Sequence, residues 1–342
     1  MSTILNYNSA DVNEYLPCCN FCNSKDFREL AAKDHQGLEM YTNVCKKCGL
    51  IFINPRPTKQ WYKKFYKEGE YRNNFLSQNI DSKNMDEKLE FMFLKGSNWG
   101  FILAKELGSF LKEGLIIDVG SGVGGVLNGL RNYLGWPVLG IEPDINESCY
   151  AKTKDIETLS CPIEEIDYLN TKIPPASNIL CIQSLNHFLD PGYFFNWAYN
   201  KLEQDGRLVL EVKDFSFQAK KAGKLESAIQ IDHPFMFTEG VLIDFVKSAG
   251  FDIVFCDRDS DKSFRALHNR KKSIPGARGT HMRLVAVKSS RRPFEDIFIN
   301  PKNYKYITRV LNNHTYLYLY GNFYQRVVKP YLSRKTWQNC FS

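Results

Sequence analysis

The stretch that most constrains the fold of this chain runs from Leu115 to Gly125 and reads LIIDVGSGVGG. It opens with a short apolar run, as expected for a buried strand, and continues into glycines at alternate positions, Gly120, Gly122 and Gly124. Glycine permits a tight turn and lets a ligand approach the backbone closely. A helical repeat of apolar residues follows at once. A strand, a glycine loop and a helix in this order predict a ligand-binding corner of a doubly wound α/β sheet.

Two acids beside this loop indicate the kind of ligand. The glycines alone also satisfy the dinucleotide pattern G-x-G-x-x-G, so they do not identify it. Asp118, at the end of the first strand, would repel a pyrophosphate but suits a cationic ligand. Glu142 follows the second predicted strand, Trp136–Ile141, where an acid can accept hydrogen bonds from both ribose hydroxyls. Both acids suit a positively charged nucleoside such as S-adenosylmethionine (SAM). The alternative interpretation, a structural turn with a surface acid and no ligand, explains the pair less well.

At this point the chain resembles the class I SAM-dependent methyltransferases. The matching segments are DVGSGVG from Asp118 to Gly124 and GIEP from Gly140 to Pro143, and the resemblance covers Phe101 to Lys288. It implies an α/β fold, a Rossmann-like seven-stranded sheet with one antiparallel strand near its edge. It also implies that SAM is bound by Asp118, Gly120, Ser121, Gly122, Gly124, Glu142, Pro143, Glu164, Gln183 and His187.

Two members of that set have alternative interpretations. Glu164 follows a short strand, where this fold reads the adenine, but an acid at a helix start is also favoured by the helix dipole. His187 follows the fourth predicted strand, Asn178–Gln183, at the edge where such sheets bind ligands. The family usually has an acid where this chain has Asn186, which weakens the case for acid–base chemistry at that position. We favour a structural or cofactor-binding role for His187.

Two C-x2-C pairs near the N-terminus predict a zinc site. Cys19 and Cys22 form the first pair and Cys45 and Cys48 the second, with 22 residues between the pairs. Four thiolates complete a tetrahedral zinc site. A redox pair is the alternative, and Cys18 could replace Cys19, although the resulting C-x3-C knuckle is less usual.

The segment after the second pair makes the resemblance more specific. It reads CGLIFINPRPT from Cys48 to Thr58 and continues into an aromatic helix. Together with the cysteine pairs it resembles the zinc-ribbon methyltransferases of bacterial surface-sugar and natural-product pathways. We therefore expect a zinc-binding ribbon at 15–57, a helical linker or lid at 58–100, a SAM-dependent methyltransferase domain at 101–290 and a basic aromatic extension at 291–342.

His233 is the candidate catalytic base. Methyl transfer is an in-line displacement that needs aligned reactants and can need a base. His233 lies in IDHPFMFT, just before a predicted helix, where the resembling sugar methyltransferases have a histidine that faces the acceptor. An imidazole that titrates near neutral pH suits proton abstraction, and Asp232 could orient the ring. A purely structural role for His233 fits the pattern about equally well.

Composition limits the partners. The net charge is +7, with 18 Lys and Arg against 4 Asp and Glu from Arg258 to Ser342. This basic end favours an anionic partner, although a solvated basic face would have the same composition. No apolar run is long enough for a transmembrane helix, and the N-terminus has no signal-peptide pattern. We therefore expect a cytoplasmic protein without a transmembrane segment, and nothing in the sequence indicates its oligomeric state.

These patterns together predict methyl transfer from SAM to a small-molecule or glycan acceptor, such as a sugar nucleotide or a surface-polysaccharide precursor. A nucleic-acid methyltransferase acting on RNA is one alternative. The segment Gln183–Asn186 counts against it, because base-methylating enzymes often carry a Pro-Pro-Tyr-type tetrapeptide there. A non-catalytic binding subunit with the same fold is the other alternative, and the intact acids Asp118 and Glu142 count against that interpretation.

Overall fold

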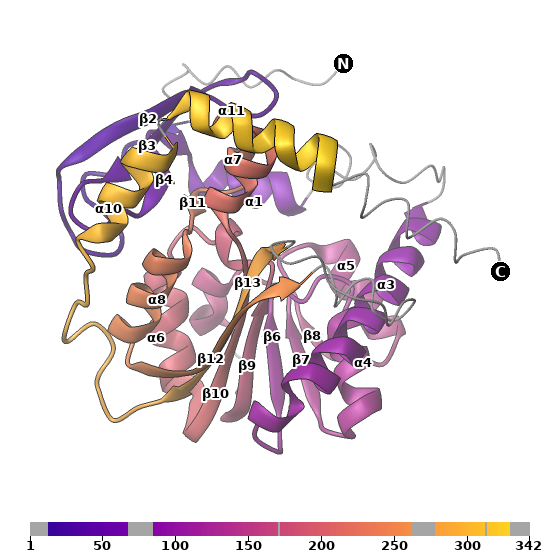
Figure 1. The fold of residues 1–342 in the computed structure, drawn as a ribbon. Coiled ribbons are helices and arrows are strands. Elements are labelled where there is room, and N and C mark those ends of the chain that lie inside the picture. Colours follow the sequence, from indigo (N-terminus) through magenta and orange to yellow (C-terminus); the bar gives the residue numbers. More distant parts are fainter. Residues whose placement is uncertain (1–12, 68–84, 170–171, 261–277, 312, 329–342) are drawn as a thin grey trace.

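The computed structural model describes residues 13–67, 85–169, 172–260, 278–311 and 313–328. At its centre is a seven-stranded sheet in the order β12-β13-β10-β9-β6-β7-β8 (Figure 1). The strand β13 pairs antiparallel with β10 and β12, whereas β10, β9, β6, β7 and β8 pair in parallel. The predicted Rossmann-like sheet with one antiparallel strand near its edge is confirmed. The strands are β6 (Ile116–Val119), β7 (Val138–Ile141), β8 (Thr158–Leu159), β9 (Ala176–Ile182), β10 (Leu202–Lys213), β12 (Phe251–Ser260) and β13 (Arg278–Lys288).

Helices cover both faces of this sheet, and the central strands are apolar on both sides. Alternate residues of a strand point to opposite faces, so Ile179 and Cys181 of β9 pack in one core and Leu180 and Ile182 in the other. The first core includes residues of α6 (Pro191–Lys201) and α8 (Glu239–Ser248). The second includes residues of α3 (Met85–Leu107) and α4 (Gly125–Leu134). This two-sided burial explains why β9 is continuously apolar from Ile179 to Ile182.

Glycines bring α3 and α4 into close contact. A Cβ atom on Gly100 would lie 2.1 Å from the carbonyl oxygen of Val126, and one on Gly129 would lie 2.1 Å from that of Ser97. The two backbones therefore approach more closely than any side chain would allow. Because α4 begins directly after the glycine loop, this contact also fixes the position of the loop.

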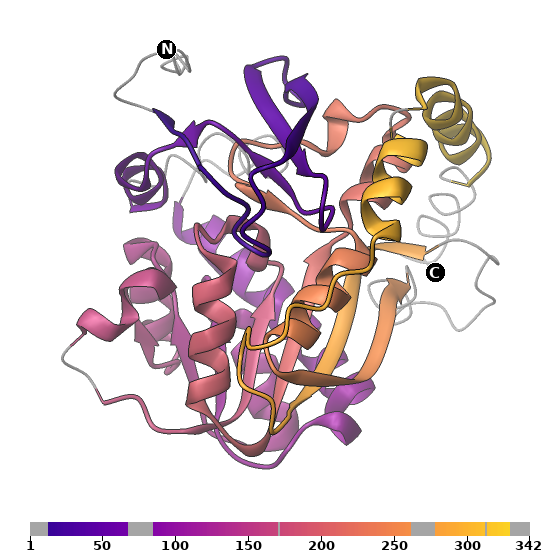
Figure 2. The same cartoon turned by 90° about the vertical axis from the view of Figure 1, so that its left-hand side faces the viewer.

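A second, four-stranded sheet lies across one end of the main sheet (Figures 1 and 2). Its order is β11-β4-β3-β2, and only one of its strands comes from the later part of the chain. That strand, β11, pairs antiparallel with β4, with Phe235 opposite Phe52 and Met236 opposite Ile51. The N-terminal module is thus completed by backbone from beyond β10. The strands are β2 (Phe27–Lys33), β3 (Glu39–Cys45), β4 (Ile51–Ile53) and β11 (Phe235–Met236).

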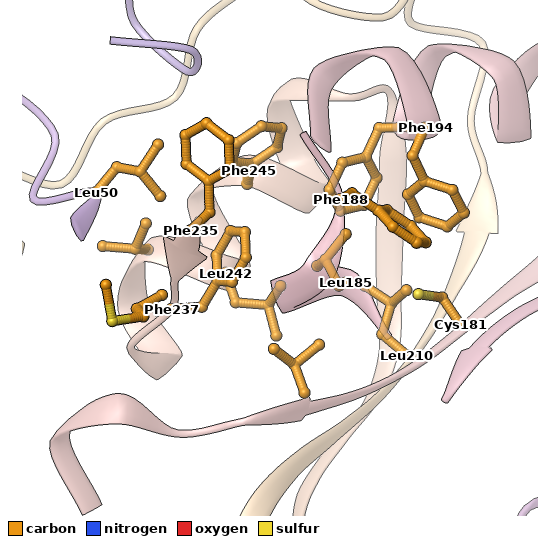
Figure 3. Packing of buried hydrophobic residues seen from close by; sticks show 14 of the residues in the cluster. Leu50, Cys181, Leu185, Phe188, Phe194, Leu210, Phe235, Phe237, Leu242 and Phe245 are labelled. Carbon is orange, nitrogen blue, oxygen red and sulfur yellow. The ribbon is translucent and has the colours of Figure 1, made fainter. Parts of the chain in front are cut away.

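A single hydrophobic core joins the two sheets (Figure 3). It runs from Leu50, beside β4, through Phe235 and Phe245 to Cys181 and Leu210 in the main sheet. These side chains are all 1% exposed or less. Burial of apolar area on this scale holds the small sheet in a fixed position against the large one.

The remaining helices and short strands lie at the same end of the molecule or on its sides. None of the helices in the described ranges is long and apolar enough to cross a membrane. Residues 261–277, between β12 and β13, and the end of the basic aromatic extension lie outside the described residues. These elements are β1 (Asn13–Glu14), β5 (Arg56–Pro57), α1 (Lys59–Lys67), α5 (Ile145–Thr153), α7 (Phe215–Ala222), α10 (Lys302–Tyr306) and α11 (His314–Phe323).

Candidate active site

A cavity of about 600 Å³ lies at the carboxyl ends of β6, β7 and β9. This volume is within the roughly 300–1,000 Å³ typical of small-molecule sites. Its walls include the glycine loop, the end of β7, the loop after β9 and the helix α1. Asp118, Ser121 and Gly124 are not part of the lining. Seven residues of the predicted SAM-binding set line it: Gly120, Gly122, Glu142, Pro143, Glu164, Gln183 and His187.

The glycine loop makes a turn that strongly favours glycine. Gly120, Gly122 and Gly124 have φ values of 79°, 55° and 77°, in the left-handed region. A Cβ atom on Gly120 would also lie 2.4 Å from the Ser184 hydroxyl oxygen. The loop therefore brings bare backbone to the cavity wall, as a ligand-binding turn requires.

Glu142 is held rigidly at the rim of the cavity. Its Oε2 accepts a hydrogen bond from the Gly122 N–H at 2.8 Å, and its Oε1 accepts one from the Asp144 N–H at 2.9 Å. The side chain is buried but lines the cavity. Each carboxylate oxygen has a second lone pair, so the group can accept further hydrogen bonds from a pair of adjacent hydroxyls.

Asp118 is a buried acid beneath the loop. It is 1% exposed, and its Oδ1 has no hydrogen-bond partner among the described residues. Burial, followed by the negative charges of Glu142 and Glu211, raises the pKa of Asp118 to about 7. A positively charged ligand nearby would favour the ionised form of this acid.

Glu164 ties two walls of the cavity together. It lies in the first turn of the short helix η2 (Ile163–Tyr168), and its Oε1 accepts hydrogen bonds from the N–H groups of Leu189 and Asp190 at 2.8 and 3.2 Å. Burial raises its pKa. One carboxylate oxygen is therefore used for structure, while the residue still lines the cavity where an adenine contact is predicted.

The helix α1 covers part of the cavity from the N-terminal side. Lys63 Nζ lies 3.0 Å from Glu165 Oε2, and Lys59 Nζ lies 3.5 Å from Glu165 Oε1. These three residues and Tyr62 line the cavity. The aromatic repeat predicted this helix, but the sequence did not indicate that its lysines would face an acid after β8, because that contact joins distant segments.

Two histidines and a carboxylate meet at the cavity wall. Asp232 Oδ2 lies 3.7 Å from His187 Nδ1 and 3.8 Å from His233 Nε2. The two imidazole rings meet edge to face, with centroids 4.8 Å apart. The Tyr66 hydroxyl lies 3.1 Å from His187 Nδ1. The structure thus brings His187 and the predicted base His233 into one cluster, an association that their distance in sequence did not indicate.

The hydrogen bonds assign the tautomer of His187. Its Nδ1 lies 2.8 Å from the backbone carbonyl oxygen of Asp232. A carbonyl oxygen only accepts hydrogen bonds, so Nδ1 carries the proton and Nε2 keeps a lone pair. In its neutral form, His187 therefore presents one basic nitrogen.

The two histidines differ in their access to the cavity. His187 lines the cavity, whereas His233 is 6% exposed and is not part of the lining. Burial, and then the nearby positive charges of His187 and Lys213, hold the pKa of His233 well below its usual value. Burial likewise raises the pKa of Asp232. His233 is therefore a neutral imidazole at pH 7, one side chain behind the cavity surface.

The four cysteines of the two C-x2-C pairs form a buried cluster. Their Sγ atoms all lie within 4.8 Å of one another, with Cys19 to Cys48 at 3.6 Å and Cys22 to Cys45 at 3.5 Å. A tetrahedral zinc site with Zn–S bonds of about 2.3 Å has sulfurs about 3.8 Å apart. Hydrogen bonding within the cluster, led by Cys19, lowers the pKa of Cys45 and raises that of Cys48. The donor set fits zinc, and Cys18 lies outside it.

The comparison with protein-family models agrees with this geometry. Residues 94–255 match the model described as a methyltransferase domain. This central part of the chain is therefore similar to a methyltransferase domain. The matched segment includes the glycine loop, Glu142 and the histidine cluster, and it excludes the four cysteines. No similar sequence is found among curated proteins.

Solved structures that this chain matches include several methyltransferases. A SAM-dependent methyltransferase from Thermotoga maritima is 18% identical to this chain. The match covers 60% of this chain and 96% of the Thermotoga maritima chain, with a TM-score of 0.44. One from Clostridium acetobutylicum is 12% identical, with coverages of 67% and 100% and a TM-score of 0.43. Magnesium protoporphyrin IX methyltransferase from Synechocystis PCC 6803 is 14% identical, with coverages of 67% and 96% and a TM-score of 0.42. Similarity at this level says nothing about the acceptor.

The position of Glu142 leads to a prediction for cofactor affinity. Replacing Glu142 by Gln keeps the size of the side chain but removes the charge that accepts from two hydroxyls. We expect SAM affinity to fall by about 10- to 100-fold, as for loss of a charge-assisted contact. Isothermal titration calorimetry measures this directly. Glu157→Gln, at an exposed position, is the matched control, and equal affinity in both variants would remove Glu142 from the ribose contact.

The raised pKa of Asp118 predicts how SAM affinity depends on pH. The cationic ligand favours the ionised carboxylate, so the complex holds fewer protons than the free protein. By linkage, SAM affinity should rise with pH between about 6 and about 8. Titrations across this range should show the rise in the wild type and a flatter profile in Asp118→Asn. Affinity that falls as pH increases would contradict the assignment.

Proposed function

We propose that this chain transfers the methyl group of SAM to an anionic small-molecule or glycan acceptor, such as a sugar nucleotide or a surface-polysaccharide precursor. The observation that supports this most directly is the contact between His187, in the cavity lining, and the buried pair Asp232 and His233. The cluster borders the same cavity as the loop and acid proposed to hold the cofactor. A methyl donor and a proton acceptor would therefore share one site.

In this proposal the cofactor would bind at the carboxyl ends of the strands. The carboxylate of Glu142 would accept hydrogen bonds from the ribose hydroxyls, Glu164 and Pro143 would border the adenine, and Gly120 and Gly122 would leave room for the methionine part. Asp118 supplies negative charge beneath the loop, and Gln183 borders the site at the end of β9. Bound SAM supplies an electrophilic methyl group on a sulfonium. The residues of the chain must then align the acceptor and remove its proton.

In this proposal, the two histidines on either side of Asp232 remove the proton from the acceptor. His187 offers Nε2 as a basic nitrogen at the cavity wall, and Asp232 stabilises the positive charge that develops when that nitrogen takes a proton. His233, neutral and buried, lies beside the same carboxylate, with its Nε2 3.8 Å from Asp232 Oδ2. It gives this buried carboxylate a polar neighbour. We propose that the predicted base His233 acts as part of this unit, together with His187, which lines the cavity.

The charges around the cluster support an anionic acceptor. Lys213, His35 and His281 all act electrostatically on His233, in addition to His187. Lys213 donates a hydrogen bond to Gln230 Oε1 at 2.9 Å, and burial lowers its pKa. The ammonium group of Lys213, which also acts on Asp232, is the positive charge through which the cluster would attract a phosphate or carboxylate group.

We also propose that Cys19, Cys22, Cys45 and Cys48 hold a zinc ion. The Leu50 N–H lies 3.5 Å from Cys48 Sγ, as expected for backbone groups that stabilise a metal thiolate. The turns after the pairs are made by Asn23 and Gly49, both with positive φ. The ion would have four protein ligands and no open position, which is typical of a structural role.

An acceptor screen tests the proposed function. Purified protein with SAM is incubated with sugar nucleotides, with the corresponding neutral sugars and with RNA, and release of S-adenosylhomocysteine is measured. Turnover with one or more sugar nucleotides and none with neutral sugars supports the proposal. Turnover with RNA alone would contradict it.

Variants of the two histidines test the mechanism with an active acceptor. We expect His187→Ala and His233→Ala each to lower kcat, with a loss of about 10²- to 10⁴-fold for the residue that takes the proton. When residues act as a unit, the effects of their substitutions on kcat do not add. The double variant should therefore lose about as much kcat as the more damaged single variant. SAM affinity and melting temperature should stay close to wild type in the cavity-facing variant. Unchanged kcat in both single variants would remove the cluster from the mechanism.

Metal analysis tests the zinc proposal. We expect about one zinc per chain in the wild type and much less in Cys45→Ser, since three thiolates bind zinc less tightly than four. Cys18→Ser is the matched control, because Cys18 is adjacent in sequence but outside the cluster, and it should keep its zinc. Equal zinc contents in Cys45→Ser and the wild type would contradict the assignment.

A further inference from the structure

The helix α11 packs on the fold by one narrow face. A Cβ atom on Gly321 would lie 2.4 Å from the Cα of Gly223, just after α7, so the two backbones are in contact. Leu317 and Tyr324, one turn away on either side, are 0% and 5% exposed. These three positions, spaced four and three residues apart, define the buried face of the helix. The opposite side of α11 points away from the protein.

That outward side carries large apolar and aromatic side chains. Tyr316, Leu319 and Phe323 are 42%, 61% and 57% exposed, and their spacing places them on one side of the helix. Tyr318 is 63% exposed. Outward positions of a helix in a globular protein are usually polar, so a row of such side chains indicates a contact surface. We call Tyr316, Leu319 and Phe323 the apolar row.

The C-terminal segment that carries the apolar row, and the helix α7 on which it packs, are rich in cations. The chain has no acid from Ile297 to its end, while Lys302, Lys305, Arg309 and Arg326 lie in the described part of this segment. On the neighbouring helix α7, Lys220 Nζ lies 5.1 Å from the Tyr306 ring centroid, and Lys221 Nζ lies 5.0 Å from that of Tyr324. Aromatic and aliphatic side chains together with lysines and arginines are typical of helices that lie in a membrane interface.

A second exposed apolar pair, on α3, lies in a different electrostatic setting. Phe91 and Leu94 of α3 are 53% and 54% exposed, much like the apolar row. Around them α3 carries three acids, Asp86, Glu87 and Glu90, and two lysines, Lys88 and Lys95, and Glu90 pairs with Lys154. The same apolar exposure therefore occurs where acids balance cations, so anionic lipid would gain little electrostatic attraction there.

We propose that α11 docks the protein onto an anionic lipid surface, with the apolar row inserted among the headgroups and the surrounding cations on lipid phosphates. A second copy of the chain fits this face less well, because a two-fold contact would bring the same cations together. The helix lies at the end of the molecule that also carries the four-stranded sheet (Figure 1). Docking by α11 would place this end of the fold next to the lipid.

Vesicle flotation with the full chain tests the proposal. We expect the wild type to float with mixed phosphatidylcholine–phosphatidylglycerol vesicles, to remain unbound with phosphatidylcholine alone, and to dissociate as salt is raised. The double variant Leu319→Glu/Phe323→Glu should bind anionic vesicles about tenfold or more weakly, since it puts charge where apolar side chains would insert. The matched control is Phe91→Glu/Leu94→Glu, which should float like the wild type.

Three results would overturn the proposal. They are absence of wild-type binding to the anionic vesicles, an equal loss of binding in both double variants, and a wild-type dimer that Leu319→Glu/Phe323→Glu dissociates while no vesicle binding is seen. The melting temperature and SAM affinity of each variant, measured in the absence of lipid, should match the wild type. These two measurements separate a docking defect from misfolding and from any failure of the proposed methyl transfer.

Discussion

The backbone pairing between β4 and β11 is the interaction on which the arrangement of the candidate site depends. It joins the N-terminal sheet to the segment that carries Asp232 and His233, and the contact extends beyond the strands. The Ile53 N–H donates to the Pro234 carbonyl oxygen at 3.0 Å, the Tyr62 hydroxyl donates to that of Ile231 at 2.8 Å, and the His35 N–H donates to that of Ile229 at 3.1 Å. Three carbonyls of one short segment are therefore held by the N-terminal module and the helix α1 that follows it. From the other side, Asn186 Nδ2 donates to the Phe235 carbonyl oxygen at 3.3 Å and His187 Nδ1 donates to that of Asp232 at 2.8 Å, so the segment is held between the two parts of the fold.

The cysteine cluster stabilises the same module from its other side. Phe21, within the first knuckle, stacks on Phe245 of α8 with ring centroids 4.5 Å apart. Asn20 Nδ2 donates to Asp190 Oδ1 at 3.0 Å, and Arg56 donates to the Leu189 carbonyl oxygen at 2.8 Å. The knuckle thus packs on the main core and on the loop after β9, which contains His187. A closed metal site with no chemistry of its own would still matter here, because it would fix the turn that makes these contacts.

The parts of this architecture that follow local patterns could be predicted from sequence, and the parts that depend on distant contacts could not. The glycine loop, the alternating strands and helices and the spacing of the four cysteines each depend on neighbouring residues, and the seven-stranded sheet was predicted correctly. A strand of two residues such as β11 has too little periodicity to detect, so its addition to the N-terminal sheet was not foreseen. The meeting of His187 and His233 depends on that addition. The sequence motif made His233 the candidate base, but its burial behind His187 follows only from how the segment is held.

The central claim is that one cavity brings the cofactor and the histidine cluster together. A crystal structure of the protein with S-adenosylhomocysteine tests it most directly. The account predicts the ribose hydroxyls within hydrogen-bond distance of Glu142 and the sulfur directed toward the part of the cavity that His187 lines. A ligand bound elsewhere, or bound with its sulfur on the side away from His187, would contradict it.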